Sequence, residues 1–240
     1  MTKKVSKARE TFITKAENAL KRSLTPDERR MVLGFDEEVV KFAVESFSNQ
    51  EIAGMLDEGD TVEFLEQLAR GPGSLHANRQ KLLRFLGPKA RKVVGALELD
   101  SELERFGGWL LGLLRDEPPS AGIRALNFGL FEGDHGCKLY VTGANRYDEH
   151  DSDWACANDW WPERRYAPVE VFSDLYGRLR KIETESWVVA QAVAILLIKA
   201  FFEKHGLEVK KVLGKRKLFI ASGFDDGDLY AIKTAFTRAA

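Results

Sequence analysis

The sequence predicts an α+β protein, in which a helical N-terminal part precedes a mostly antiparallel sheet packed with helices. Three observations lead to this prediction. Capping boxes and apolar residues at helical spacing fill the first hundred residues. The Pro-containing segment 116–120 interrupts that pattern, and alternating apolar and polar residues begin soon after it. We therefore expect a helical domain at residues 1–117 and an α+β domain at residues 122–240.

The N-terminal helices are predicted from their start signals and apolar stripes. Capping boxes, in which Glu follows Ser or Thr by three positions, begin at Thr25, Ser48 and Ser101. Apolar stripes at helical spacing follow, formed by Val39, Phe42, Ala43 and Phe47, by Ile52, Met55 and Leu56, by Val62, Leu65 and Leu68, and by Leu82, Leu83, Phe85 and Leu86. Gly and Pro at 71–73 and 87–88 break the pattern. Short helices with short breaks indicate a compact helical array.

The C-terminal elements are predicted from period-two patterns and from one long apolar run. Strands are expected at 126–130 and 138–142 around a turn at 133–136, with a third at 153–156. A helix at 168–179 and a buried helix at 187–204, ended by Gly206, should follow. Further strands are expected at 209–212 and 218–221. After the hairpin signal at 226–227, we expect a strand and then a helix containing Phe236.

Composition and missing motifs exclude several classes of protein. The net charge of −1 argues against a dedicated nucleic-acid protein. No apolar segment follows the basic N-terminus as in a signal peptide, and the run at 187–198 is too short to cross a bilayer, so we expect a cytoplasmic protein. Cys137 and Cys156 are interpreted as reduced thiols. No phosphate-binding glycine loop, catalytic motif or paired-histidine metal motif occurs, so no catalytic residue, cofactor or metal is predicted.

A basic segment at residues 70–92 has two interpretations. No acidic residue occurs between positions 68 and 97, where seven Lys and Arg residues fall: Arg70, Arg79, Lys81, Arg84, Lys89, Arg91 and Lys92. These side chains could bind phosphates, as in a nucleic-acid-linked module. Charges that are solvated or paired within the chain are the favoured interpretation, because the chain as a whole is nearly neutral.

An acidic loop rich in aromatic residues is the main candidate for function. Its carboxylates are Asp148, Glu149, Asp151 and Asp153, which could be a solvated loop, a divalent-cation site or a patch facing a partner. The spacing is not that of an EF-hand. Trp154, Trp160 and Trp161 could cap the sheet's core or anchor a partner. Since neighbours in an extended segment point to opposite faces, one of Trp160 and Trp161 should be exposed. A second acidic turn at 223–228 could join the loop if the sheet brings them together.

The second half of the chain resembles the immunity proteins of bacterial polymorphic toxins. The resemblance lies in Gly129-Leu130-Phe131-Glu132, Tyr147-Asp148, Asp153-Trp154-Ala155-Cys156, Asp159-Trp160, Pro162 and the turn at 223–228. It covers about the last 120 residues and none of the helical part. It implies a cytoplasmic inhibitor that occludes a cognate toxin, often a basic one, through an acidic surface. The alternative is a metal-dependent hydrolase that uses the acidic loop with His150. Oligomeric state is not predicted.

Overall fold

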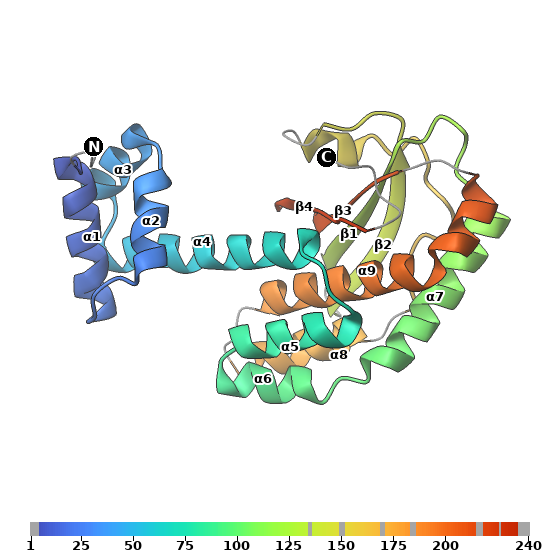
Figure 1. Ribbon diagram of the computed structural model, residues 1–240, viewed down its shortest axis with the longest axis horizontal. Coiled ribbons are helices and arrows are strands. Elements are labelled where there is room, and N and C mark those ends of the chain that lie inside the picture. Colours follow the sequence, from blue (N-terminus) through green and yellow to red (C-terminus); the bar gives the residue numbers. More distant parts are fainter. Residues whose placement is uncertain are drawn as a thin grey trace. The chain divides into compact units, whose positions relative to one another are not determined.

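The computed structural model describes residues 5–133, 136–148, 152–168, 171–182, 186–214, 218–225 and 227–234. The chain forms two compact units, Met1–Phe64 and Leu65–Ala240 (Figure 1). The second unit carries helices packed on a four-stranded sheet, so the predicted α+β class is confirmed. The segment at 116–120, predicted as a domain boundary, connects a helix to the sheet inside this second unit.

The first unit is helical and has its own apolar core. It contains α1 (Lys7–Leu20), α2 (Pro26–Gly34), α3 (Glu37–Ser46) and the beginning of α4 (Asn49–Arg70). The capping box at Thr25 is confirmed: its side chain accepts from the Glu28 amide at 3.2 Å, while Glu28 accepts from the Thr25 amide at 2.5 Å. The buried core consists of Phe12, Ala16, Leu24, Val32, Val40, Ala43 and Ile52.

The second unit begins with the end of α4 and three further helices. These are α5 (Leu75–Phe85), α6 (Pro88–Gly95) and α7 (Leu99–Asp116), and the predicted breaks at 71–73 and 87–88 separate them as expected. The N-cap predicted at Ser101 is wrong by three residues, because α7 has Glu98 as its N-cap. Leu99 is only 1% exposed, so burial of this side chain extends the helix toward the N-terminus beyond the capping box.

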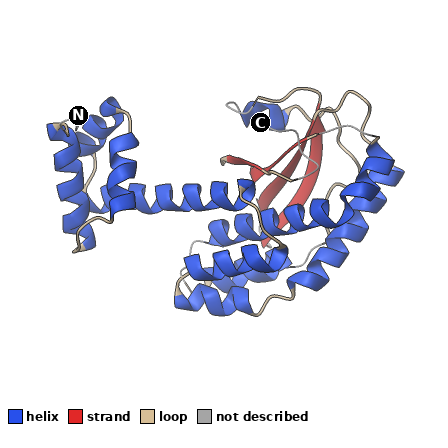
Figure 2. Ribbon diagram, in the orientation of Figure 1, coloured by secondary structure: helices blue, strands red, loops and turns tan. Residues whose placement is uncertain are grey.

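The sheet is mixed, with strand order β2-β1-β3-β4 (Figure 2). The strands are β1 (Ala125–Gly133), β2 (Gly136–Ala144), β3 (Phe219–Phe224) and β4 (Leu229–Ala231). The β1–β2 and β3–β4 pairs are antiparallel, whereas the central β1–β3 pair is parallel. Phe128 of β1 contacts Phe106 of α7 and Phe202 of α9 (Ser186–Leu213), so helices cover one face of the sheet.

The long helix α9 confirms the predicted buried helix and extends beyond it. It passes through Gly206 without ending, so the strand predicted at 209–212 is wrong. Val209 and Leu213, one helical turn apart, are both buried, and this contact pattern outweighs the strand preference of the valines. Gly214, with φ of 72°, follows the end of the helix. By length and composition α9 could cross a membrane, but most of it is buried in this unit.

Two other predictions near the sheet have different outcomes. The strand predicted at 153–156 is wrong, because Ser152–Cys156 forms a short 3-10 helix, η1. Its Trp154 packs edge-on against Phe219, which fixes the turn above the sheet. The helix predicted at 168–179 is α8 (Val171–Arg180). The last strand of the prediction is β4, while Phe236 lies outside the described residues.

Candidate ligand and partner site

An open cavity lies on the sheet face opposite α9. Since side chains alternate along β1, Phe128 faces the helices while Asn127 and Gly129 face the other side. There η1 and the loops around it enclose a cavity of about 450 Å³. Its lining consists of Asn127, Tyr140, Ser152, Asp153, Ala155, Cys156, Asn158, Trp161, Phe224, Asp225, Gly227 and Leu229. This volume suits a small molecule or a long side chain from a partner.

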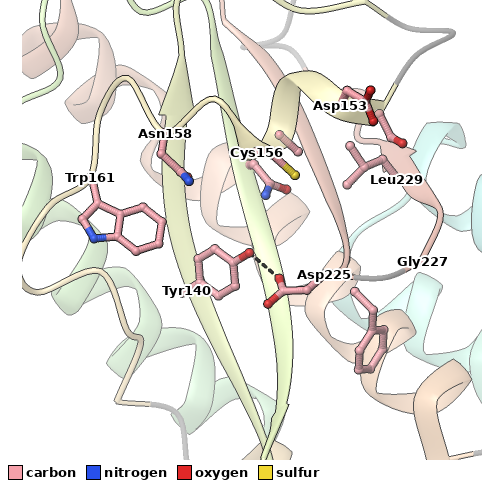
Figure 3. Close-up of a pocket in the computed structure, with 12 residues that line it drawn as sticks. Tyr140, Asp153, Cys156, Asn158, Trp161, Asp225, Gly227 and Leu229 are labelled. Atoms are coloured by element: carbon pink, nitrogen blue, oxygen red, sulfur yellow. Dashed lines mark hydrogen bonds between the residues drawn. The ribbon is translucent and has the colours of Figure 1, made fainter.

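The side chain of Tyr140 extends from β2 over the neighbouring strand β1 at the base of this cavity. Its partner in the β1–β2 register is Gly129, where a Cβ atom would stand only 2.1 Å from the tyrosine Cζ. The ring therefore lies directly over the β1 backbone, and its hydroxyl donates to Asp225 after β3 (Figure 3). Burial, followed by the hydrogen bond to Asp225, raises the pKa of Tyr140. The hydroxyl keeps its proton at neutral pH and remains a donor to the carboxylate.

Asn127 forms a polar, buried part of the cavity wall. Its residue is 4% exposed, and its Oδ1 atom has no hydrogen-bond partner in the part of the chain that the structure describes. Buried polar atoms in proteins are nearly always paired. This acceptor is therefore available to a hydrogen-bond donor that enters the cavity.

The two cysteine thiols lie in different surroundings. Cys156 is exposed and lines the cavity, whereas Cys137 is buried on the helix-covered face of β2. Burial raises the pKa of the Cys137 thiol to about 12. Only Cys156 can therefore meet a ligand or a reagent in the folded protein.

The rim of the cavity is a segment that runs beside β2. The Val141 amide donates to the Arg165 carbonyl at 3.0 Å, and Gly143 exchanges two backbone hydrogen bonds with Trp160, also at 3.0 Å. Trp161, which lies between these contacts, is 50% exposed, and Tyr166, which follows Arg165, is 45% exposed. The Arg165 guanidinium lies 4.2 Å from the centroid of Trp161, which holds the indole in place.

The same segment is fixed to the end of α7. Trp160 donates its indole N–H to the Glu117 carbonyl at 3.0 Å. Arg164 pairs with Asp116 at 2.8 Å and with Glu117 at 2.9 Å. These contacts position the exposed Trp161 without any contribution from a ligand.

The residues predicted for partner binding occupy different surroundings. Asp148 and Asp153 are exposed, and Asp153 lines the cavity. Glu149 and Asp151 lie outside the described residues. Trp154 is half-buried against Tyr147 and Phe219. As the alternation predicts, Trp160 is 8% exposed and its neighbour Trp161 is 50% exposed.

The structure adds residues that sequence reasoning did not select. Asn127 and Tyr140 looked like ordinary strand positions, and only the register shows that they face the cavity. Asp225 belongs to the acidic turn that could join the first acidic loop. The cavity does bring Asp225 and Asp153 together, so this expectation about the turn is confirmed.

The metal alternative stays a prediction, because Glu149, His150 and Asp151 of the acidic loop lie outside the described residues. Among the described residues, no group of three or more His, Cys, Asp or Glu side chains could hold a metal ion. Several side chains of the basic segment donate to backbone carbonyls: Arg79 to Gly95 and Leu97 at 3.0 Å each, Lys81 to Pro72 at 3.0 Å and Arg91 to Leu86 at 2.9 Å. These contacts favour the interpretation that the basic charges serve the chain itself.

Comparison of the chain with protein-family models, curated proteins and solved structures gave no match.

Proposed function

We propose that the chain is a cytoplasmic immunity protein that neutralises a basic toxin by occluding it. The observation that carries the proposal is the cavity itself, lined by Asp153 and Asp225 and by no Lys or Arg among its described lining residues, with Trp161 half exposed at its edge. Carboxylates attract a basic surface, and a pre-positioned tryptophan is typical of an interface anchor. The resemblance of the C-terminal half to immunity proteins further supports a role in immunity.

Binding by occlusion would require no chemistry from this chain. Trp161 is already held by Arg165, so little side-chain entropy would be lost when a partner covers it. The acidic groups would accelerate encounter with a basic partner and make the affinity fall with ionic strength.

Co-expression tests the neutralising role. The tagged chain is used to capture its partner from its native host, and that partner is then expressed alone and with the chain in a bacterial strain. The proposal predicts arrested growth with the partner alone and restored growth with both. A captured partner that does not impair growth, or whose toxicity the chain leaves unchanged, would contradict the immunity role.

The acidic loop assignment has its own test. Changing Asp148, Asp151 and Asp153 together to Asn should weaken capture of the partner, most strongly at low salt. Unchanged binding by this triple variant would show that the loop is not part of the recognition surface.

A further inference from the structure

The polar groups of the cavity are mainly hydrogen-bond acceptors. The Oδ1 atom of Asn127 has no partner among the described residues, and the Asn127 residue is 4% exposed. Tyr140 uses its hydroxyl proton in the bond to Asp225, so its oxygen can only accept from a ligand. Asp225 and Asp153 add carboxylate oxygens. A ligand that satisfies these groups has to bring several donors.

The charge of the lining side chains determines which sign of charge a ligand should carry. Two carboxylates and no basic side chain appear among the described lining residues, which disfavours phosphates and other anions. Arg165, stacked on the rim tryptophan, is not among the lining residues. The cavity therefore suits a cation that carries donors, with Leu229 on the same sheet face available to contact an apolar stem.

We propose that this cavity binds a guanidinium group. A guanidinium is planar, permanently charged and carries five N–H donors, so it can serve a carboxylate and an amide oxygen together. An ammonium has three donors and is more strongly hydrated, so it should bind more weakly. The cavity of about 450 Å³ accommodates a whole arginine side chain. The proposed function supplies one source, an arginine of the toxin; a free guanidino compound is the other.

A titration with a minimal probe tests the site on the full-length protein. N-acetyl-argininamide is added while the side-chain amide resonance of Asn127 and the indole resonance of Trp161 are followed by NMR. We expect saturable shifts of both signals and protection of Cys156 from alkylation. The lysine analogue should bind more weakly, and the neutral citrulline analogue should lose about tenfold or more in affinity, because it lacks the charge. Absence of saturable shifts with the arginine probe would overturn the proposal.

Variants identify the groups that hold the probe. Asp225→Asn keeps an oxygen for the Tyr140 hydroxyl but removes the charge, and it should weaken binding about tenfold or more. The control is Asp174→Asn, which removes the same charge from an exposed position on α8 and should leave affinity unchanged. Asn127→Leu should also weaken binding where its spectrum remains that of a folded protein. Equal affinity of Asp225→Asn and the wild type would overturn the proposal.

Competition separates the two sources and distinguishes this inference from the proposed function. A protein partner that the arginine probe displaces, and that Asp225→Asn fails to retain, identifies the source as a partner arginine. Saturable binding of the probe without any protein partner supports the guanidinium site with a free compound as its source, while the proposed function fails. A partner that is retained despite saturating probe and despite Asp225→Asn overturns the inference and leaves the proposed function standing.

Discussion

Replacing Gly129 with alanine should displace Tyr140 and disrupt the base of the cavity. The added Cβ would stand 2.1 Å from the tyrosine Cζ and 2.3 Å from its hydroxyl oxygen, so the ring has to move. Moving it breaks the hydrogen bond to Asp225. Overpacking costs about 1–3 kcal/mol, and a hydrogen bond to a charged group contributes roughly 1.5–3 kcal/mol. Because the two effects overlap, we expect the free energy of unfolding to fall by about 2–4 kcal/mol.

Urea denaturation followed by tryptophan fluorescence measures this loss of unfolding free energy in the second compact unit, which contains Gly129. All five tryptophans of the chain lie after Phe64, so their emission reports the second unit. The matched control is Gly108→Ala in α7, where an added Cβ meets nothing within 4 Å. Because alanine is the better helix former, this control should raise the free energy of unfolding by about 1 kcal/mol.

A double-mutant cycle decides whether Tyr140 is the cause. Tyr140→Ala removes the ring that the new methyl group would strike. Adding Gly129→Ala to that variant should then cost at least about 1 kcal/mol less than adding it to the wild type. Equal costs in the two backgrounds, or a Gly129→Ala protein as stable as the wild type, would refute the close contact between Gly129 and the ring.

Three further predictions follow from buried or paired groups. Hydrogen bonds from Arg22 are the main cause that lowers the pKa of Glu28 to about 2. The ionised Glu28 carboxylate therefore stabilises the fold above its ordinary pKa of 4.5, and this stabilisation is lost as the pH falls toward 2. Glu28→Gln should cost about 1–3 kcal/mol at pH 7, and the cost should shrink below pH 4 in denaturation followed by circular dichroism; a cost independent of pH would contradict it. In the native protein a thiol reagent should modify Cys156 alone, with Cys137 reacting only after unfolding; two fast thiols would show that Cys137 is accessible. Lys199 is 1% exposed and donates to the carbonyls of residues 68 and 69 at 2.7 and 3.2 Å. Lys199→Met should lower the unfolding free energy by about 3 kcal/mol, because these carbonyls lose their buried donor. An unchanged unfolding transition, followed by fluorescence, would show that the hydrogen bonds of Lys199 do not stabilise the fold.

The helical part was predictable from local signals. The capping box at Thr25 acts through contacts within the first helical turn, so four residues of sequence suffice to identify it. The glycine and proline breaks likewise act on their own backbone. Ser101 shows the limit of local signals, because Leu99 is buried and the helix begins there, before the capping box.

The errors after residue 150 have a common physical cause. Val209 and Val212 favour strands locally, but packing of α9 keeps them helical through Gly206. The segment at 153–156 was expected to be a strand after the acidic loop, yet contact of Trp154 with Phe219 holds it as a turn of 3-10 helix. In both places tertiary contacts outweigh local preference, and such contacts cannot be read from spacing alone.

The candidate site was only partly visible in the sequence. The exposed tryptophan of the Trp160–Trp161 pair follows from the alternation of an extended segment, and the acidic residues are apparent from composition. Asn127 and Tyr140 were not recognisable, because their importance depends on the register of β1 and β2 and on the space above Gly129. Together with residues of the acidic loop, Asn127 and Tyr140 line the cavity.

The most direct test of recognition by the acidic cavity is capture of the native partner by the tagged chain at low and high salt, quantified by mass spectrometry. The wild type is compared with an Asp153→Asn, Asp225→Asn double variant and with the Asp174→Asn control. We predict one stoichiometric basic protein, retained by the wild type and the control at low salt and lost at high salt or with the double variant. Equal retention by the double variant, or no partner at either salt, would contradict recognition through the cavity.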